Sequence, residues 1–205
     1  MSNILLTGGS GLLGTELQKL MKFDAPSEKE FNILDIPSGY KPDMIVHAAA
    51  YTDVGKAQNG EQGKCYNVNV NGTRNMLEAF PHIPFIYIST EYAHNPQTIY
   101  GVTKRAAEKL VEEHEAPCLV LRTLFKPNPF PFEKAFTDQY TQGDYVDIIA
   151  GLIVNEINHW DLRDDLRYVG TGRKTMYQLA KQTNPDVGKC SVDDFKDYPI
   201  PKDYE

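Results

Sequence analysis

The sequence contains few cysteines, no excess of positive charge and no long apolar run. Its 3 cysteines, Cys65, Cys118 and Cys190, form neither an even set nor a C-x-x-C pair. That pattern argues against a disulfide framework and structural zinc, and it fits a reducing compartment. Acidic residues outnumber basic ones by 28 to 21, for a net charge of −7, which argues against nucleic acid and membrane surfaces as partners. There is neither a signal-peptide pattern nor a run of the roughly 18 apolar residues that span a membrane. We therefore expect a cytoplasmic protein without a metal site.

Short apolar strands alternate with helical segments along the first part of the chain. Continuous apolar runs predict buried parallel strands, and recurring apolar positions predict helices at Gln62–Phe80 and Val102–His114. The strands fall at residues 4–6, 44–46, 85–88 and 118–121. This alternation predicts an α/β fold with a Rossmann-like, doubly wound parallel sheet. Three prolines between Lys126 and Phe132 then interrupt regular structure. We predict a dinucleotide-binding core at residues 1–125 and a reduced, compressed substrate-side segment at residues 126–205, packed on the same domain.

Three glycines lie between the first strand and the first helix. Gly8, Gly11 and Gly14 form a G-x-x-G-x-x-G pattern. Gly8 would allow a tight turn, Gly11 would let backbone N–H groups approach a pyrophosphate, and Gly14 would let the helix pack against the strand. The position between a strand and a helix favours dinucleotide binding over a glycine turn without a ligand.

The residues after this loop leave the choice between NAD(H) and NADP(H) open. Asp35 follows Gly14 by about the 20 positions that are typical of the acidic residue on an NAD ribose. A strand near Met21–Asp24 would instead place Ser27, Glu28 and Lys29 beside the ribose, with Asp35 and Ile36 against the adenine. Ser27 and Lys29 would then be available to a 2′-phosphate, which Glu28 would repel. We favour NADP(H) slightly over NAD(H).

A tyrosine and a lysine stand four positions apart at the start of a predicted helix. This spacing places Tyr100 and Lys104 on one helical face. A nearby ammonium stabilises a phenolate and so moves a tyrosine hydroxyl toward general acid–base use. Ser89 and Thr90 close the preceding strand, at the sheet edge where ligands of open α/β proteins bind.

Together these segments resemble the extended short-chain dehydrogenase/reductase superfamily, and within it the dTDP-4-dehydrorhamnose reductase group of sugar-nucleotide reductases. The segments that carry the resemblance are Thr7–Gly14, Ile45–Val54, Asn69–Thr73, Ser89–Tyr92, Tyr100–Lys104 and Leu121–Thr123.

The resemblance implies a role for individual residues. Thr90 would bind the substrate carbonyl oxygen, Tyr100 would donate a proton to it, and Lys104 would hold the nicotinamide ribose and tune Tyr100. Further cofactor contacts are expected at Ser10, Leu12, Leu13, Ala48, Ala49, Ala50 and Asn69, and substrate contacts at Tyr51, Glu91 and Arg122. The implied reaction is hydride transfer from the nicotinamide to the 4-keto carbon of a nucleotide-linked sugar or related carbohydrate.

Two departures from the family pattern keep other functions open. The loop Glu91–Ile99 is shorter than in the family, and the region after Arg122 is compressed. An epimerase or dehydratase of the same superfamily is one alternative. A non-catalytic NAD(P)-binding regulator is another, since the regulatory subunit of methionine adenosyltransferase resembles the same family. The resemblance also implies a possible homodimer through the two helices at Gln62–Phe80 and Val102–His114.

Overall fold

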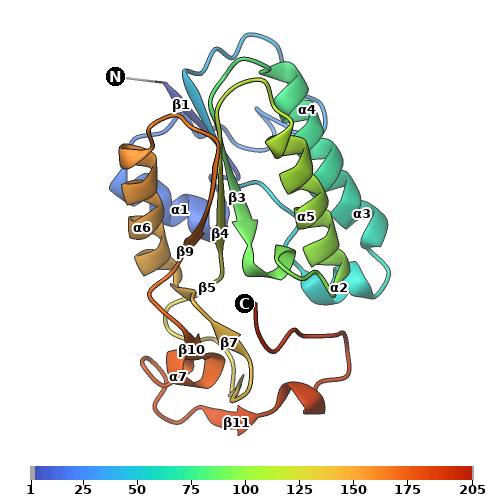
Figure 1. Ribbon diagram of the computed structural model, residues 1–205, viewed down its shortest axis with the longest axis vertical. Helices are drawn as coiled ribbons and strands as arrows, with labels where there is room; N and C mark the ends of the chain where they lie inside the picture. The colour runs from blue at the N-terminus through green and yellow to red at the C-terminus, as the bar shows by residue number, and fades with distance from the viewer. Residues whose placement is uncertain (1–2, 205) are drawn as a thin grey trace.

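A five-stranded parallel sheet forms the centre of the protein (Figure 1). The computed structural model describes residues 3–204. The strands lie in the order β1-β2-β3-β4-β9, and each pairs in parallel with its neighbour. Their bounds are β1 Ile4–Thr7, β2 Met44–His47, β3 Phe85–Thr90, β4 Cys118–Thr123 and β9 Asp165–Val169. The α/β, Rossmann-like architecture predicted from the alternating pattern is confirmed.

Helices cover both faces of the sheet. On one face lie α1 (Leu12–Leu20) and α6 (Val146–His159), and on the other lie α3 (Gln62–Tyr66), α4 (Gly72–Ala79) and α5 (Ile99–Glu112). The short α2 (Val54–Gln58) precedes α3. The helix predicted over residues 62–80 is therefore present, but a π-helical segment, η1 (Asn67–Asn71), separates its two α-helical parts.

The chain changes direction across the sheet at β1. Asp24 forms a parallel bridge to Leu5 and two backbone hydrogen bonds with Ile4 and Leu6, so it pairs with one edge of β1. The next strand, β2, pairs with the opposite edge. A reversal of this kind opens a crevice at the carboxyl ends of the strands, which is where open α/β sheets bind ligands.

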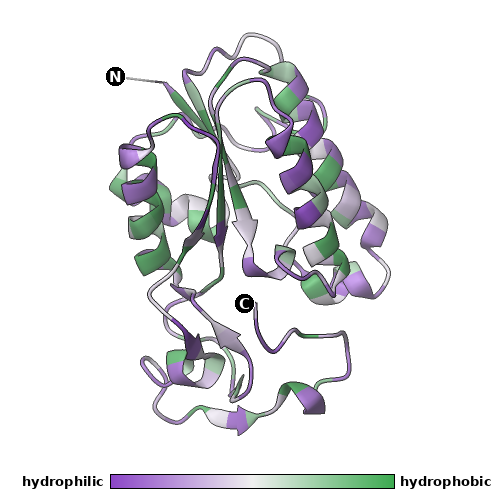
Figure 2. Cartoon of the chain, viewed as in Figure 1, coloured by the Kyte–Doolittle hydropathy of each residue, from purple (hydrophilic) through white to green (hydrophobic). Residues whose placement is uncertain are grey.

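Apolar side chains fix α1 and α6 on their face of the sheet. Leu13 and Leu17 of α1 pack in one buried cluster with Ile149 and Ile153 of α6, and α6 is hydrophobic over most of its visible length (Figure 2). Full burial of one such side chain contributes about 1.5–3 kcal/mol. This packing holds the start of α1, and with it the glycine loop, at the carboxyl edge of the sheet.

The segment after β4 forms a small lobe and also returns to the sheet. This C-terminal lobe, residues 125–145 and 170–204, lies below the sheet in Figure 1. It contains three two-stranded pairings, β5 with β8, β6 with β11 and β7 with β10, together with α7. Their bounds are β5 Phe125–Lys126, β6 Lys134–Phe136, β7 Tyr140–Thr141, β8 Asp144–Tyr145, β10 Lys174–Thr175, α7 Met176–Ala180 and β11 Gly188–Cys190. Two 3-10 turns, η2 (Glu91–Ala93) and η3 (Val192–Asp194), complete the described elements. Helix α6 and strand β9 come from the same half of the sequence but pack on the central sheet.

The longest helices among the described residues, α5 and α6, have 14 residues each. Within residues 3–204, no helix combines the length and the apolar character that a membrane span requires.

Candidate active site

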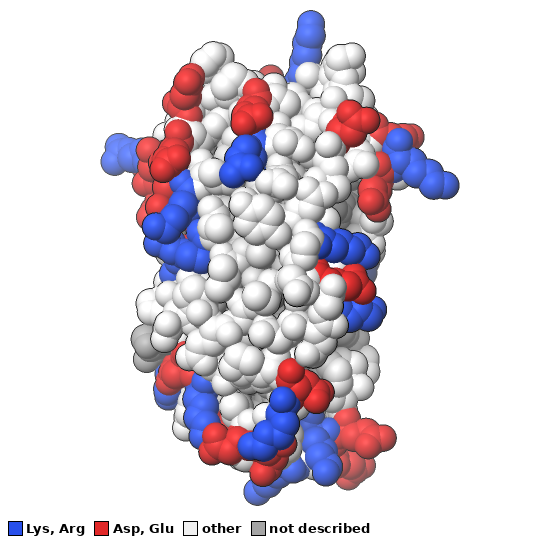
Figure 3. Space-filling model, turned by 90° about the vertical axis from the view of Figure 1, so that its right-hand side faces the viewer, with Lys and Arg blue, Asp and Glu red and all other residues white. Residues whose placement is uncertain are grey.

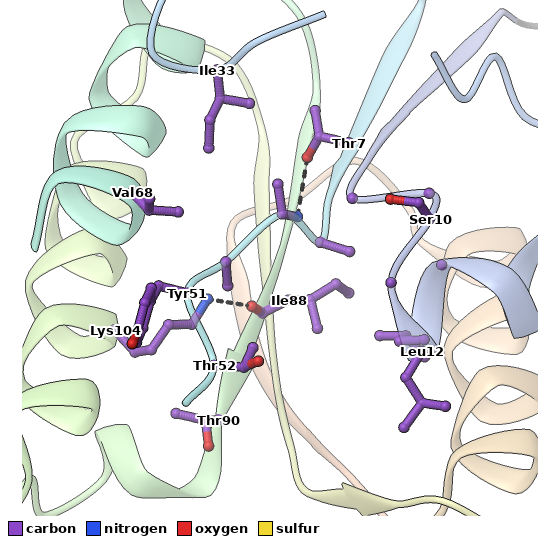
Figure 4. Close-up of a pocket in the computed structure, with 18 of the residues that line it drawn as sticks. Thr7, Ser10, Leu12, Ile33, Tyr51, Thr52, Val68, Ile88, Thr90 and Lys104 are labelled. Atoms are coloured by element: carbon purple, nitrogen blue, oxygen red, sulfur yellow. Dashed lines mark hydrogen bonds between the residues drawn. The ribbon is translucent and has the colours of Figure 1, made fainter. Parts of the chain in front are cut away.

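A cavity of about 600 Å³ opens at the carboxyl edge of the sheet. Its walls come from the segments that follow β1, β2, β3 and β4 and from the start of α5. Figure 4 shows Ser10 and Leu12 on one side and Tyr51 and Lys104 on the other, with Thr90 at one end. We call it the dinucleotide cavity, because the glycine loop forms one of its walls.

Every residue of the glycine loop for which the sequence predicted a cofactor contact lines the cavity. Gly8, Ser10, Gly11, Leu12, Leu13 and Gly14 all line the cavity. Gly8 has φ +73°, and an added Cβ would stand 2.6 Å from the Ala49 nitrogen. A Cβ on Gly14 would stand 2.3 Å from the Gly8 oxygen. The loop and helix thus approach at distances that only glycine allows, and the N-terminus of α1 faces the cavity, as pyrophosphate binding requires.

Three alanines after β2 form the floor beside this loop. Ala48, Ala49 and Ala50 line the cavity, as predicted. The Ala49 N–H donates to Thr7 Oγ1 at 3.3 Å (Figure 4), and Thr7 Oγ1 also lies 2.6 Å from Nδ1 of His47. Burial and then the nearby Lys104 lower the pKa of His47 to about 3, so the imidazole is neutral. A buried, uncharged hydrogen-bond chain therefore holds the alanine segment in place.

The predicted contacts for the adenosine end do not reach the cavity wall. Ser27 donates from both its nitrogen and its hydroxyl to Glu30, at 2.9 and 2.7 Å. Asp35 is exposed, and its N–H donates to the Asn32 oxygen to close a turn. Ile36 packs against the apolar cluster that contains Phe31 and Ile33. The wall is formed instead by Pro26, Glu28 and the segment 31–34. The rule that looks about 20 positions beyond Gly14 does not identify these residues. The strand expected near Met21–Asp24 is reduced to the single bridge between Asp24 and Leu5, so the chain reaches the cavity wall earlier than the rule assumes.

Thr90 and Tyr100 meet at the substrate end of the cavity, and both line it. Thr90 is the last residue of β3, and Tyr100 lies in the first turn of α5, which Thr98 caps by accepting from the Gly101 N–H. Burial raises the pKa of Tyr100 above its ordinary value, and a side-chain hydrogen bond with Thr90 acts in the opposite direction. The phenol is therefore protonated near neutral pH and is available as a proton donor.

Lys104 lies one turn further along α5. Its Nζ donates to the Ile88 oxygen at 2.8 Å (Figure 4) and stands 4.1 Å from the centre of the Tyr87 ring. Burial lowers the pKa of Lys104 to about 7, although the carboxylate of Glu108 raises it. Lys104 lines the cavity as predicted, and its effect on Tyr100 stays a prediction.

Asn69 supports the site from behind and is not part of the cavity wall. It lies in the π-helical segment and is 1% exposed. Its Oδ1 accepts from the Tyr51 N–H at 2.8 Å, and its Nδ2 donates to the Tyr51 oxygen at 3.2 Å and to Thr103 Oγ1 at 3.0 Å. The predicted cofactor contact is therefore corrected to a positioning role, whereas Tyr51 does line the cavity.

Glu91 is buried and does not face a substrate, contrary to the sequence-based expectation. It is 2% exposed and accepts from Thr141 Oγ1 at 2.7 Å and from the Gln142 N–H at 2.9 Å. Burial raises the pKa of its carboxyl group. The shortened loop turns this side chain toward β7, where it joins the C-terminal lobe to the end of β3.

Arg122 is also buried and does not line the dinucleotide cavity, contrary to the expected substrate contact. Side chains alternate along β4, so Arg122 points to the α5 side. Its Nε and Nη2 donate to the two carboxylate oxygens of Glu108 at 2.8 and 2.7 Å, and its Nη1 donates to the Tyr168 hydroxyl at 2.8 Å. Burial alone would raise the pKa of Glu108, but hydrogen bonds from Arg122, Ser89 and Arg105 lower it overall. The pair is an internal support for α5.

Replacing Arg122 by methionine should therefore reduce stability and leave ligand binding unchanged. Glu108 is completely buried, and removal of one partner of a buried pair typically costs about 3–5 kcal/mol. We expect a loss of that size in the free energy of unfolding, measured in urea.

Arg167→Met is the control, because Arg167 forms partly exposed ion pairs with Glu156 and Asp165 that contribute less than about 1 kcal/mol. An Arg122→Met protein with normal stability but weakened substrate binding would restore Arg122 to the substrate site.

Several wall residues were not predicted, and one group of them had a signal in the sequence. Thr123, the last residue of β4, lines the cavity together with Leu124, Phe125 and Lys126, which follow it. A buried strand followed by polar and aromatic residues marks the same carboxyl edge as Thr90. Val68 lines the cavity from the π-helical segment, and no spacing rule identifies such an insertion.

Comparisons with known proteins give a family and a fold. A family model described as the RmlD substrate binding domain matches residues 1–151. A dTDP-4-dehydrorhamnose reductase from Aggregatibacter actinomycetemcomitans is 30% identical over 151 residues, which cover 60% of this chain and 51% of the relative. The chain spans about half the length of the first curated relatives it matches.

Two crystal structures have the same fold over almost the whole chain. A dTDP-4-dehydrorhamnose reductase from Clostridium acetobutylicum superimposes with a TM-score of 0.85 at 22% identity, covering 98% of this chain and 88% of that one. The corresponding protein from Bacillus anthracis, crystallised with NADP, gives a TM-score of 0.82 at 24% identity with the same coverage.

Proposed function

The chain belongs to the RmlD substrate binding domain family, and from that premise we propose that it is an NAD(P)H-dependent reductase. Its substrate would carry a keto group, at the 4-position of a nucleotide-linked sugar or a related carbohydrate. The observation that supports this most directly is that Thr90, Tyr100 and the glycine loop line one cavity. A curated relative named dTDP-4-dehydrorhamnose reductase supports the same class of reaction.

Each side chain at the substrate end has a defined task in this proposal. The bound nicotinamide supplies a hydride to the carbonyl carbon. Thr90 holds the carbonyl oxygen through its hydroxyl, and Tyr100 donates its phenolic proton to the oxygen as the alcohol forms. Because burial keeps the pKa of Tyr100 high, the proton is present near neutral pH. Lys104 holds the nicotinamide ribose and provides positive charge that stabilises the phenolate left on Tyr100.

We propose NADP(H) as the preferred cofactor, with NAD(H) as the alternative. The Bacillus anthracis relative was crystallised with NADP, which supports this preference. Glu28 lies in the cavity wall and would repel a 2′-phosphate that approached it closely. A direct comparison of NADPH and NADH therefore belongs in the first assay.

The test follows the absorbance of NADPH and NADH with purified protein and a panel of nucleotide-linked 4-keto sugars. Cofactor oxidation supports the reductase. Retention of oxidised cofactor through purification, with no net oxidation, would favour an epimerase or dehydratase. Cofactor binding without turnover on any substrate of the panel would favour the non-catalytic regulator.

We also propose that the chain forms a homodimer through α3, α4 and α5. The middle of the face over these helices is uncharged, and the charged side chains stand around it (Figure 3). Tyr66 on α3 and Val102 on α5 are 48% and 49% exposed. Light scattering should give twice the 23.1 kDa of one chain.

Val102→Arg should then give monomers, whereas Ile148→Arg, at a 42% exposed position on the opposite helix layer, should not. If light scattering gives the mass of a single chain for the wild-type protein, the homodimer proposal is wrong. The division into residues 1–125 and 126–205 and the cytoplasmic location remain predictions.

A further inference from the structure

Two consecutive residues of β3 hold the ammonium group of Lys104. Its Nζ donates to the Ile88 oxygen at 2.8 Å (Figure 4) and lies 4.1 Å from the centre of the Tyr87 ring. Strand β2 ends opposite Tyr87, whereas β3 continues to Thr90. The edge of β3 beyond Tyr87 is therefore not covered by β2, which leaves the Ile88 oxygen to a side-chain donor. The ammonium group lies at this edge, with the face of the Tyr87 ring as its second contact.

The Tyr87 side chain is fully buried and does not line the dinucleotide cavity. It belongs to the apolar cluster between the sheet and α5, which also contains Phe85 and Ala107. Within residues 3–204, the Tyr87 hydroxyl makes no hydrogen bond of normal geometry, and a buried hydroxyl without a partner destabilises a fold. The hydroxyl therefore does not account for a tyrosine at this position, whereas the ring face has a defined partner in Lys104.

The contact between this ring and Lys104 favours the charged form of the lysine. The face of an aromatic ring carries the negative part of its quadrupole and attracts a cation, most strongly where water is excluded. Lys104 is 2% exposed, so the contact is of the strong kind. Burial by itself favours the neutral amine and lowers the pKa of Lys104 to about 7. The ring opposes that effect of burial.

Resting on the role proposed above for Lys104, we propose that Tyr87 is a positioning residue of the reductase site. Its ring keeps the ammonium group of Lys104 charged and in place, so that Lys104 can hold the nicotinamide ribose. Tyr87 touches neither cofactor nor substrate in this arrangement and acts only through Lys104.

The other ionisable groups around Lys104 keep one charge state near neutral pH. Burial alone would raise the pKa of Glu108, but its hydrogen bonds lower it overall, so the carboxylate stays ionised. Burial raises the pKa of Cys65 on α3 and of Tyr100 on α5, so both stay protonated. Burial and then Lys104 lower the pKa of His47 on β2 to about 3, so the imidazole stays neutral. Lys104 is therefore the member of this group that changes charge near neutral pH.

Calorimetric titration of NADP⁺, or of NAD⁺ if that binds more tightly, tests the proposal at about pH 5 and pH 8. A charged Lys104 donates to the ribose, so the affinity falls as the pH rises through the pKa of Lys104. Tyr87→Leu removes the ring and should lower that pKa by about 0.5 to 1.5 units. Compared with the wild type, we expect the variant to bind about 3- to 30-fold more weakly at pH 8. At pH 5 both proteins carry the charge, and their affinities should agree within about twofold.

Lys126 also lines the dinucleotide cavity, and burial lowers its pKa. Its titration is common to the wild-type and variant proteins, so it cancels when their affinities are compared at one pH.

Phe85→Leu is the matched control for Tyr87→Leu. Phe85 lies two positions earlier on β3, is fully buried in the same cluster, and has its ring beside that of His47, as Tyr87 does. This variant should lose stability in a similar way but keep the cofactor affinity within about twofold of the wild type at both pH values. Tyr87→Phe is the conservative variant, because it retains the ring face and loses only the hydroxyl without a partner. It should restore the wild-type pH dependence and be at least as stable as the wild type.

The proposal is overturned if Tyr87→Leu binds the cofactor like the wild type at pH 8. It is also overturned if the variant weakens binding equally at both pH values, or if Phe85→Leu gives the same loss at pH 8. Should Tyr87→Leu fail to fold, proton NMR of the wild-type and Tyr87→Phe proteins decides. A ring face moves the resonance of the Lys104 ε-methylene group upfield, and an unshifted resonance in both proteins would contradict the proposal.

This proposal and the reductase activity can fail separately, because cofactor binding does not require turnover. A protein that binds NADP⁺ with the expected pH dependence but reduces no carbonyl compound would lose the reductase function and retain the role of Tyr87. Turnover together with cofactor binding that does not respond to Tyr87→Leu would retain the reductase and remove the role of Tyr87.

Discussion

Replacing Tyr100 by phenylalanine is expected to lower kcat for carbonyl reduction by about 100- to 10,000-fold, the usual contribution of a positioned general acid. The substitution removes the hydroxyl that donates the proton and keeps the ring, including its edge-to-face contact with Tyr92. The glycine loop and the alanine segment are on other elements, so NADPH affinity should stay within about twofold of the wild-type value. Initial rates and a cofactor titration on the same preparation measure both quantities.

Tyr177→Phe is the control for this experiment, because Tyr177 lies on α7, outside the proposed dimer face, and does not line the dinucleotide cavity. It should retain full activity. Equal turnover in the Tyr100→Phe and wild-type proteins would show that another group donates the proton. An absence of turnover in both, with normal NADPH binding, would favour the non-catalytic regulator over the reductase.

The sequence predicts the glycine loop and the Tyr100–Lys104 pair well, because their geometry is local, whereas the adenosine end, which depends on the reduced second strand, was missed. Gly8 and Gly11 lie in the turn between β1 and α1, Gly14 lies in the first turn of α1, and Tyr100 and Lys104 lie one helical turn apart on α5. Contacts of this kind depend on spacing within a single element or connection. The fold class follows for a similar reason, since four of the five strands of the sheet, β1 to β4, each contain a continuous apolar run.

The substrate half was predicted less well, because it depends on the direction in which side chains point in and beside the shortened loop Glu91–Ile99. Glu91 and Arg122 both adjoin strand ends near the site, yet both point into the protein and bind partners there. The partner of Arg122 is Glu108, whose position on α5 is apparent only when α5 lies against β3 and β4. The pairing of β6 with β11 could not be predicted from the sequence for the same reason, since the two strands pair across more than one intervening element.

Replacing Gly14 by alanine is expected to weaken NADPH binding by about 100-fold or more, which corresponds to about 2.7 kcal/mol. A Cβ at this position would stand 2.3 Å from the Gly8 oxygen and 2.7 Å from the Gly9 Cα. Both are backbone atoms, so either the loop or the start of α1 must move. Because pyrophosphate binding relies on aligned N–H groups at that helix start, the displacement should cost affinity. A titration with NADPH measures the effect.

Gly151→Ala in α6 is the matched control, since an added Cβ there meets nothing within 4 Å. Alanine is favoured over glycine inside a helix by about 0.5–1 kcal/mol, so this variant should be slightly more stable and bind NADPH normally. The same propensity acts at Gly14, where it opposes the clash. Unchanged NADPH affinity in Gly14→Ala would mean that the propensity gain and a small shift of the loop accommodate the methyl group. In that case the close approach of α1 to the loop would not be what holds the pyrophosphate, and the role assigned to Gly14 would be withdrawn.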